Sequence, residues 1–445
     1  MKSTNTSEPI PAWLPANAQD WFNYSARYTA SNHLLHAVLE LAGHLDHERL
    51  TQAVKLSADA EPILGCRFIE DPHHPYWQRI ENIEESKWCV LLETDRVEES
   101  VQQFVGVPFD ADSDPQVSAG VIRSKEKDTL CIKLNHAACD GAGVKQYLRL
   151  LAAIYTKLGM DSGYVPSRNV RGKRDQSALF MELGIVDWST LLNTGVAELQ
   201  PGWAFPFRRL DLPAGESTHL ISQIKGEQVE ALRIAAKRKG CTLNDLILTA
   251  YFRALWILVR SDQGEATAIQ VTVDLRRHLT SLHDQAICNL SGAVNVLIQD
   301  KMGEPFEQTL VRIVVIMQEH KKSMLGIQSA AAFELLASMG YEEALHWLHE
   351  ARSRAVSWGK AFPMLSNFGI IGDPGFMFGD SAVRAAYMIS PALFAPGFML
   401  GASTYSSMLT LCVNFYASNT SADDIQLLLS RMTDELNGYA AGGTR

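Results

Sequence analysis

The succession of apolar and polar positions along the chain predicts strands and helices in alternation. Short apolar runs that end at glycine, proline or polar turns are typical of strands, whereas apolar residues that recur every three or four positions are typical of helices. Strands are expected on this basis at 33–43, 63–69, 76–80, 117–123, 129–135, 269–275, 364–371, 382–389, 397–405 and 408–416. Helices are expected at 46–58, 144–158, 226–239, from 242 onward, 304–322 and 423–436. The mixture predicts an α/β (α+β) protein with more than one sheet.

Two of the expected helices begin with recognisable caps. Asp46 stands immediately before a helical apolar pattern, where its carboxylate can accept a hydrogen bond from a free backbone N–H. Thr242 is followed three residues later by Asp245, which approximates a capping box, although the usual partner is Glu or Gln. We therefore expect both helices to start at these residues.

Size and composition favour two lobes joined by a linker. The chain has 445 residues, of which 47% are hydrophobic. Single cores stop growing near roughly 250–300 residues, so a second core is expected. The segment 166–177, PSRNVRGKRDQS, is basic and almost free of large apolar residues, as linkers commonly are. The prediction is an N-terminal lobe over 1–165, a linker over 166–200 and a C-terminal lobe over 201–445.

Charge and cysteine usage narrow the classes of partner. With 40 basic and 50 acidic residues the net charge is −10, which argues against a nucleic-acid partner. The seven cysteines form no CxxC pair, so a zinc site is not expected and a reducing compartment is favoured. No apolar signal-peptide core and no run of about 18 apolar residues occurs, so the expected location is cytoplasmic, without a membrane span.

The segment Thr129–Gly143, TLCIKLNHAACDGAG, carries the candidate chemistry. Strand alternation places His136 in the same row as the apolar residues Leu130, Ile132 and Leu134, at the end of the expected strand. Imidazole titrates near neutral pH, so a histidine at a strand end can accept a proton from an attacking hydroxyl or amine. A histidine in an apolar row is also commonly a hydrogen-bonded core residue, and that alternative stays open at this point.

Asp140 follows His136 by four residues, and Gly141 opens the next helix. The carboxylate at this place has two interpretations. It can belong to the reactive site, or it can cap the following helix, since a negative charge suits the positive end of a helix dipole. Glycine at such a turn permits a close approach that a residue with Cβ resists.

The motif NHAACDG resembles the HHxxxDG signature of the CoA-dependent acyltransferase superfamily, which includes chloramphenicol acetyltransferase, peptide-synthetase condensation domains and plant BAHD acyltransferases. Four further segments resemble the family in its own order: HLLHAVLELAGHLDHERLTQAV, GCTLNDLILTAYFRAL, VTVDLRRHL and LSNFGIIG. The resemblance therefore covers most of the chain. The plant signature DFGWG is absent and NFGIIG replaces it, which argues against a plant-type enzyme.

The resemblance implies a fold and a set of roles. Two chloramphenicol acetyltransferase-like lobes would form a V with a tunnel between them, and His136 would be the general base at its centre. Asp140 would be structural and pair with Arg276. A backbone N–H near Gly141 would steady the oxyanion. Other candidate contacts to the oxyanion or substrate are Ser366 and Asn367.

The family also predicts substrates and partners. The acyl donor would be acyl-CoA or a phosphopantetheinyl thioester, acting as a co-substrate, with no bound cofactor and no metal. An acyl or peptidyl carrier protein is a possible partner, and a monomer is expected. The sequence departs from the pattern at Asn135, which replaces the first histidine of the motif. By alternation Asn135 points away from His136, so base catalysis need not suffer.

The favoured prediction is an acyltransferase that moves an acyl group from a thioester to a hydroxyl or an amine. Two alternatives remain. One is a stand-alone condensation enzyme that joins carrier-bound substrates through an amide or ester bond. The other is a catalytically silent module that binds a carrier protein or a small ligand. Loss of the first motif histidine at Asn135 is a small indication in that direction.

Overall fold

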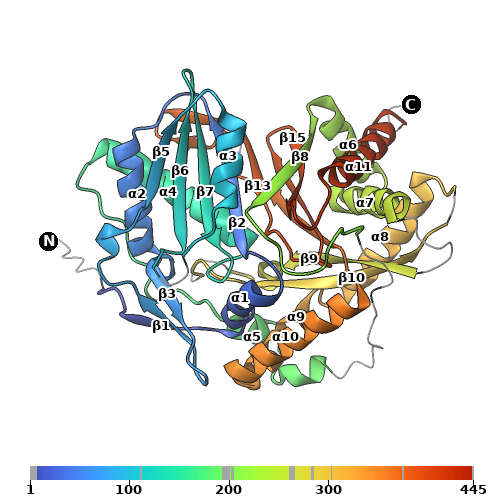
Figure 1. Ribbon diagram of the computed structural model, residues 1–445, viewed down its shortest axis with the longest axis horizontal. Coiled ribbons are helices and arrows are strands. Elements are labelled where there is room, and N and C mark those ends of the chain that lie inside the picture. Colours follow the sequence, from blue (N-terminus) through green and yellow to red (C-terminus); the bar gives the residue numbers. More distant parts are fainter. Residues whose placement is uncertain are drawn as a thin grey trace.

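The computed structural model describes residues 8–110, 113–192, 201, 205–259, 266–281, 285–301, 303–372 and 375–442. It contains two six-stranded sheets that stand next to each other, with helices against both (Figure 1). This mixed architecture confirms the predicted α/β class. The assignment of 1–165 and 201–445 to separate lobes stays a prediction, and residues 193–200 of the expected linker lie outside the described residues.

The first sheet has the order β12-β13-β2-β7-β6-β5. Its apolar face packs against two helices, α2 and α4, and the shorter α3 covers the opposite face. The strands expected at 117–123 and 129–135 are β6 and β7, which pair antiparallel as a hairpin. The bounds are β2 Leu34–Leu41, β5 Cys89–Glu93, β6 Val117–Arg123, β7 Asp128–Asn135, β12 Met377–Phe378, β13 Ser381–Ile389, α2 His47–Ala60, α3 Val97–Gly106 and α4 Gly141–Met160.

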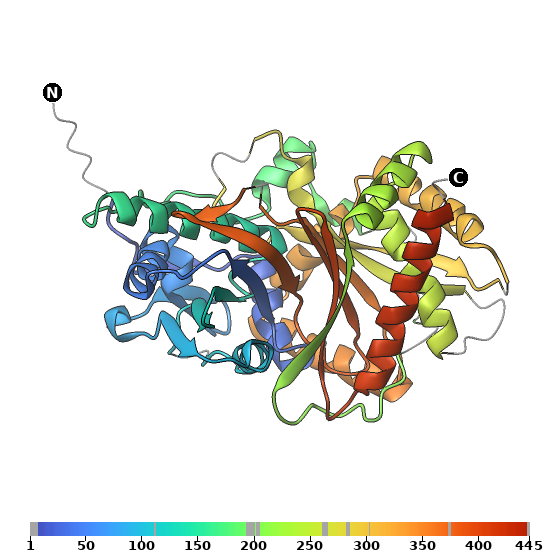
Figure 2. The same ribbon diagram turned by 90° about the horizontal axis from the view of Figure 1, so that it is seen from above.

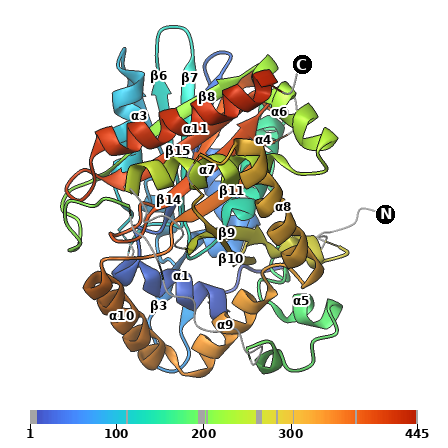
Figure 3. The same ribbon diagram turned by 90° about the vertical axis from the view of Figure 1, so that its right-hand side faces the viewer.

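The second sheet has the order β10-β9-β11-β14-β15-β8. One face is buried under α6, α7, α8 and α11, and Figure 3 shows α7 and α11 lying across it. The bounds are β8 Ser217–Lys225, β9 Ala266–Asp274, β10 Ser291–Gln299, β11 Met364–Ile370, β14 Met399–Tyr405, β15 Met408–Tyr416, α6 Glu227–Arg238, α7 Leu243–Val259, α8 Phe306–Lys322 and α11 Ala422–Gly442.

A third layer lies along one side of both sheets. Helix α1 packs against α9 and α10, which follow it by some 300 residues in the chain (Figure 1). A small sheet of order β1-β4-β3 adjoins α1. The bounds are β1 Trp13–Pro15, β3 Cys66–Ile69, β4 Tyr76–Arg79, α1 Ala18–Thr29, α5 Ser177–Glu182, α9 Ile327–Ser338 and α10 Tyr341–Trp358.

The C-terminal part of the chain contributes strands to both sheets. Strands β12 and β13 come from the C-terminal part of the chain, yet β13 pairs antiparallel with β2 of the first sheet. Figure 2 shows the orange β13 beside the dark blue β2. The next strand, β14, belongs to the second sheet, so the connection between β13 and β14 passes from one sheet to the other.

The predicted caps are confirmed. The Asp46 carboxylate accepts the backbone N–H of Arg49 at 3.0 Å. Thr242 and Asp245 bond each other reciprocally: the Thr242 N–H donates to Oδ2 of Asp245 at 2.8 Å, and the Asp245 N–H donates to Oγ1 of Thr242 at 3.3 Å. Aspartate therefore serves as the reciprocal partner that the capping box usually takes from Glu or Gln.

Two predicted strands are partly wrong. The run expected as a strand over 63–69 begins with a 3-10 helix, Pro62–Gly65, because proline fixes a backbone angle that suits a helix start. The strand expected over 269–275 ends at Asp274, whose side chain accepts the N–H of Arg276 and starts a second 3-10 helix, Leu275–His278. Arg276 therefore lies on this 3-10 helix, immediately after the strand.

No single helix in the described ranges is both long and apolar enough to cross a membrane. Only α6 and α7 together reach the necessary length and composition, and they are bent by 104° relative to each other.

Candidate active site

The imidazole of His136 is held at the end of β7 by its own backbone and by one amide side chain. The backbone N–H of His136 donates to the backbone carbonyl of His33 at 2.8 Å. The side-chain Nδ2 of Asn289 donates to the carbonyls of His136 and Ala137 at 2.8 and 2.9 Å. This orientation turns Oδ1 of Asn289, which can only accept, toward Nδ1 of His136 at 3.2 Å. We infer that Nδ1 carries the proton and that Nε2 carries the free lone pair.

Burial lowers the pKa of His136 below its ordinary value, which favours the neutral base at pH 7. The ring of His33 lies beside it, with 5.2 Å between ring centroids. His33 bonds Ser31 through Nδ1 at 2.6 Å and Asn23 through Nε2 at 3.2 Å. Its pKa is lowered strongly by burial and further by the neighbouring His136. Both histidines are therefore expected to be neutral at physiological pH.

A cavity of about 470 Å³ opens onto His136. Its walls come from both sheets and from helices α1 and α9 of the third layer, so residues far apart in sequence face one another across it. The lining residues include Phe22, Asn23, His33, Leu35, His136, Gly141, Ala142, Lys145, Thr272, Asp274, Ser291, Ala332, Phe333, Met364, Ser366, Asn367, Phe368, Leu393 and Met399. The apolar and aromatic members outnumber the charged ones, as is usual in small-molecule sites.

Asp140 joins the His136 loop to the second sheet. Its Oδ1 accepts the N–H of Gly143 at 2.9 Å and so caps α4, while its Oδ2 accepts the N–H of Leu290 at 2.8 Å. Nη1 of Arg276 forms an ion pair with the same Oδ2 at 2.8 Å, and Nη2 donates to the carbonyl of Cys288 at 2.8 Å. The pairing of Asp140 with Arg276 that the family resemblance implies is thus present, and Asp140 also caps α4.

Both members of this pair are almost fully buried. Burial alone would oppose ionisation of Asp140, yet the charge of Arg276 and the hydrogen bonds to the carboxylate hold its pKa below the ordinary value. The pair is therefore charged inside the protein. Removing Arg276 would leave the buried carboxylate of Asp140 without its counter-charge, whereas removing Asp140 would leave Arg276 with only the half-exposed Asp274 at 3.2 Å.

Gly141, at the start of α4, lies against Phe368 of the second sheet. A Cβ on this residue would be 2.4 Å from Cδ1 of the Phe368 ring, which stands on β11 of the second sheet. Any larger residue must push the ring or the start of α4 aside. Phe368 also lines the cavity, so such a movement changes the shape of the cavity beside His136.

Replacing Gly141 with alanine is expected to lower kcat/KM of the activity proposed below by about 10²-fold, because misplacement of reacting groups by about 1 Å costs that much. Steady-state kinetics and a melting curve measure the effect. Gly438→Ala is the matched control, since a Cβ there meets nothing within 4 Å. Equal kinetics for both variants would show that the Gly141–Phe368 contact does not shape the site.

Ser366 and Asn367 both line the cavity, on β11. Both polar atoms of the Asn367 side chain already form hydrogen bonds. Its Nδ2 donates to Oδ1 of Asn244 at 3.1 Å, and its Oδ1 accepts the N–H of Gly369 at 3.0 Å. Ser366 accepts from the hydroxyl of Thr272 at 3.4 Å and keeps its own proton to donate. Of the two sequence candidates, Ser366 is therefore the better placed donor.

Asn135 does not line the cavity. Its Oδ1 accepts the N–H of Ala137 at 3.0 Å, so it shapes the turn that follows β7. This agrees with the expectation that it points away from His136.

Sequence reasoning missed several polar residues of the site, among them His33, Asn289 and Lys145. Nζ of Lys145 donates to the carbonyl of Phe368 at 2.6 Å, across the cavity wall, and burial lowers its pKa. One signal was available for Lys145, because it follows Gly141 by one helical turn and so shares its face. For His33 and Asn289 no local signal existed, since their partners are distant in the chain.

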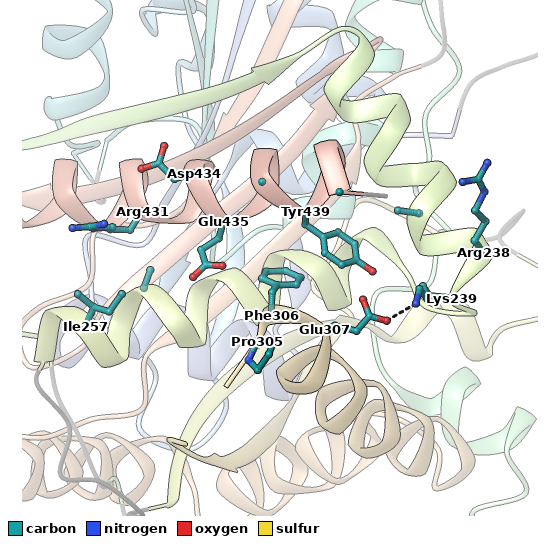
Figure 4. Close-up of a pocket in the computed structure, with 14 residues that line it drawn as sticks. Arg238, Lys239, Ile257, Pro305, Phe306, Glu307, Arg431, Asp434, Glu435 and Tyr439 are labelled. Carbon is teal, nitrogen blue, oxygen red and sulfur yellow. Dashed lines mark ion pairs between the residues drawn. The ribbon is translucent and has the colours of Figure 1, made fainter. Parts of the chain in front are cut away.

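A larger groove of about 800 Å³ lies elsewhere, between α6, α7, α11 and the start of α8. Figure 4 shows its acidic and basic side chains on the groove walls, with an ion pair between Lys239 and Glu307 at 2.6 Å. It shares no lining residue with the cavity at His136 and contains neither histidine nor cysteine. The histidines His33 and His136 therefore belong to the smaller cavity alone of these two.

Comparisons with known proteins agree with this geometry. The condensation domain family model matches residues 14–168, about a third of the chain, and this range contains His136 and Asp140. The O-acetyltransferase pyr7 of Aspergillus fumigatus is 27% identical over 299 residues, which is 60% of this chain and 56% of that enzyme. The chain thus matches little more than half the length of this relative.

Solved structures share the whole fold. The first condensation domain of the calcium-dependent antibiotic synthetase, in complex with a substrate analogue, superposes with a TM-score of 0.70 at 14% identity and 98% coverage of both chains. The trichothecene 15-O-acetyltransferase TRI3 of Fusarium sporotrichioides gives a TM-score of 0.68 at 12% identity, covering 96% of this chain and 95% of that one. These findings confirm the predicted resemblance: the chain has the fold of condensation domains and CoA-dependent acyltransferases.

Proposed function

We propose that the protein transfers an acyl group from a thioester to a hydroxyl or amine, with His136 as general base. The observation that carries the proposal is the imidazole at the cavity wall, with Nδ1 turned to Asn289 and no hydrogen-bond partner for Nε2 among the described residues. The two O-acetyltransferases among the similar proteins support a hydroxyl acceptor. The same fold in a condensation domain supports the alternative of carrier-bound substrates.

The chemistry follows from the placement of groups. Nε2 of His136 removes the proton of the acceptor while its oxygen or nitrogen attacks the thioester carbonyl. The oxyanion that develops needs hydrogen-bond donors. The proposed donors are the hydroxyl of Ser366 and the backbone N–H groups of Gly141 and Ala142 at the start of α4, because these residues line the cavity. When the intermediate collapses, the C–S bond breaks and the thiolate takes the proton from His136. An ester or amide and a free thiol are the products.

The proposal includes how substrates reach the cavity and how the loop that carries His136 is held. Donor and acceptor would enter the cavity from opposite sides, between two lobes that act together as a monomer. Asp140 and Arg276 hold the loop that carries His136, without taking part in proton transfer. Acyl-CoA or a phosphopantetheinyl thioester would be consumed as co-substrate.

The test is release of free thiol from acetyl-CoA in the presence of a panel of alcohols and amines, followed by mass spectrometry of the product. We expect thiol release that depends on both the acceptor and the protein. Activity with carrier-bound acyl groups and none with free acyl-CoA would favour the condensation enzyme. Absence of thiol release from both kinds of donor would contradict the transferase and favour a binding module.

A further inference from the structure

A second cavity, of about 440 Å³, lies on the other face of the first sheet. It is bounded by β5, β6, α3 and the segment that follows α3, and it shares no lining residue with the cavity at His136. Most of its walls are apolar. The lining residues include Val90, Leu91, Leu92, Phe104, Val107, Pro108, Phe109, Asp114, Pro115, Gly120, Val121, Ile122 and Lys133.

Lys133 is the unusual member of this cavity. Strand alternation turns it to the face opposite His136, and only 4% of its surface is exposed. Its Nζ donates to the carbonyl of Val107 and lies 4.7 Å from the ring centroid of Phe104 and 5.6 Å from that of Phe109. Buried lysines are normally paired with a carboxylate. Within the described ranges, no carboxylate lies within ion-pair distance of this ammonium.

Among the described residues, the ammonium has fewer hydrogen-bond acceptors than it has donors. Of its three N–H donors, one is accepted by the Val107 carbonyl, and no second acceptor lies among those residues. Burial lowers the pKa of Lys133 to about 8, and Asp114 and Glu216 oppose this shift only through longer-range charge. A buried cation without an anionic partner is costly, so an anion that reaches Nζ is favoured by both charge and hydrogen bonding.

The walls around Lys133 select for an apolar ligand body. The Phe104 ring rests on Gly120, where a Cβ would lie 2.7 Å from it, so the ring is fixed beside the ammonium. At the rim, Val90, Leu92 and Val107 leave 45%, 42% and 43% of their surfaces exposed. A carboxylate with a hydrocarbon chain would satisfy the ammonium and cover these side chains together.

We propose that this cavity is a binding site for a small apolar carboxylate, with its carboxylate on Nζ of Lys133 and its chain along Val90, Leu92 and Phe104. The volume of about 440 Å³ is within the range of small-ligand sites. The site is separate from the proposed catalytic cavity, so a ligand held here leaves His136 accessible.

The test is calorimetric titration of the full chain with decanoate, and with decanol as a probe of the same length without charge. We expect wild type to bind decanoate at least about tenfold more tightly than decanol, because hydrogen bonds to charged groups are worth about 1.5–3 kcal/mol. In Lys133→Met this preference should disappear. The substitution should leave the protein folded, because replacing a buried charge with an apolar residue of similar volume is often neutral or stabilising.

A further variant separates this site from the catalytic cavity. His136→Ala should bind decanoate as wild type does, whatever its effect on turnover, so failure of the transferase proposal leaves this result unchanged. Equal affinity for decanoate in wild type and Lys133→Met would overturn the proposal, and would assign Lys133 only to anchoring Val107. Loss of decanoate binding in His136→Ala would overturn it as well, by placing the ligand in the other cavity.

Discussion

Replacing His136 with alanine is expected to lower kcat by about 10²- to 10⁴-fold, the range that general-base assistance supplies. The lone pair on Nε2 is lost, while the cavity, the donors on its wall and the Asp140–Arg276 pair are retained. Because the imidazole is only half-buried, the free energy of unfolding should change by about 1 kcal/mol. Thiol-release kinetics and chemical denaturation measure the two quantities on the same sample.

The pH dependence gives an independent test of the same base. The base must be neutral to act, so activity falls as the pH drops through the pKa of His136. Burial lowers that pKa below the ordinary value for histidine of about 6.5, so the acid limb of kcat/KM should lie below pH 6.5. An acid limb above pH 7 would contradict the lowered pKa.

The matched control for the histidine substitution is His73→Ala, which alters an exposed turn far from both cavities. It should keep wild-type kinetics and stability. Wild-type turnover in His136→Ala itself, with an intact fold, would exclude general-base catalysis by this residue.

Replacing Asp140 with alanine is expected to lower the free energy of unfolding by about 3–5 kcal/mol, the effect of removing one partner of a buried ion pair. Arg276 would keep only the half-exposed carboxylate of Asp274, at 3.2 Å, as a counter-charge, and the N–H of Gly143 would lose its acceptor. Thermal and urea unfolding measure the loss. Turnover should fall mainly in proportion to the folded fraction.

Two companion variants divide this effect into its causes. Asp140→Asn keeps a side-chain oxygen for the cap of α4 but removes the charge, so it isolates the ion-pair contribution. The double variant Asp140→Ala, Arg276→Met should be more stable than Asp140→Ala alone, because no buried charge remains. A variant of Asp140 with an unchanged melting temperature and no turnover would instead make this carboxylate a participant in the chemistry.

The sequence predicted those parts of the site that depend on local pattern. His136, Asp140 and Gly141 belong to one strand-turn-helix segment, whose alternation and cap are readable from neighbouring residues. The pairing with Arg276 came from the family resemblance, because 136 residues separate the two partners. The 3-10 helix that carries Arg276 was missed. The apolar pattern continues to Leu275, but the Asp274 cap ends the strand one residue earlier.

Other contacts could not be predicted because nothing local marks them. Asn289 orients the ring of His136 from 153 residues away, in a segment without regular structure. His33 looks like the first residue of an apolar strand, and its left-handed backbone angle, with φ of 51°, is invisible in the sequence. Helices α1, α9 and α10 were also missed, and within α9 the apolar residues are not confined to one face of the helix.

The path of β13 has a consequence for how the chain folds during synthesis. Strand β2 is almost wholly apolar and buried, and β13 is its neighbour on one side. Until residue 389 has left the ribosome, that side of β2 has no partner, although the rest of its sheet is already made. Unpaired apolar strand edges attract other chains. The nascent protein must therefore shield this edge, by transient contacts or by a chaperone, while the roughly 250 residues between the end of β7 at Asn135 and the end of β13 at Ile389 are made.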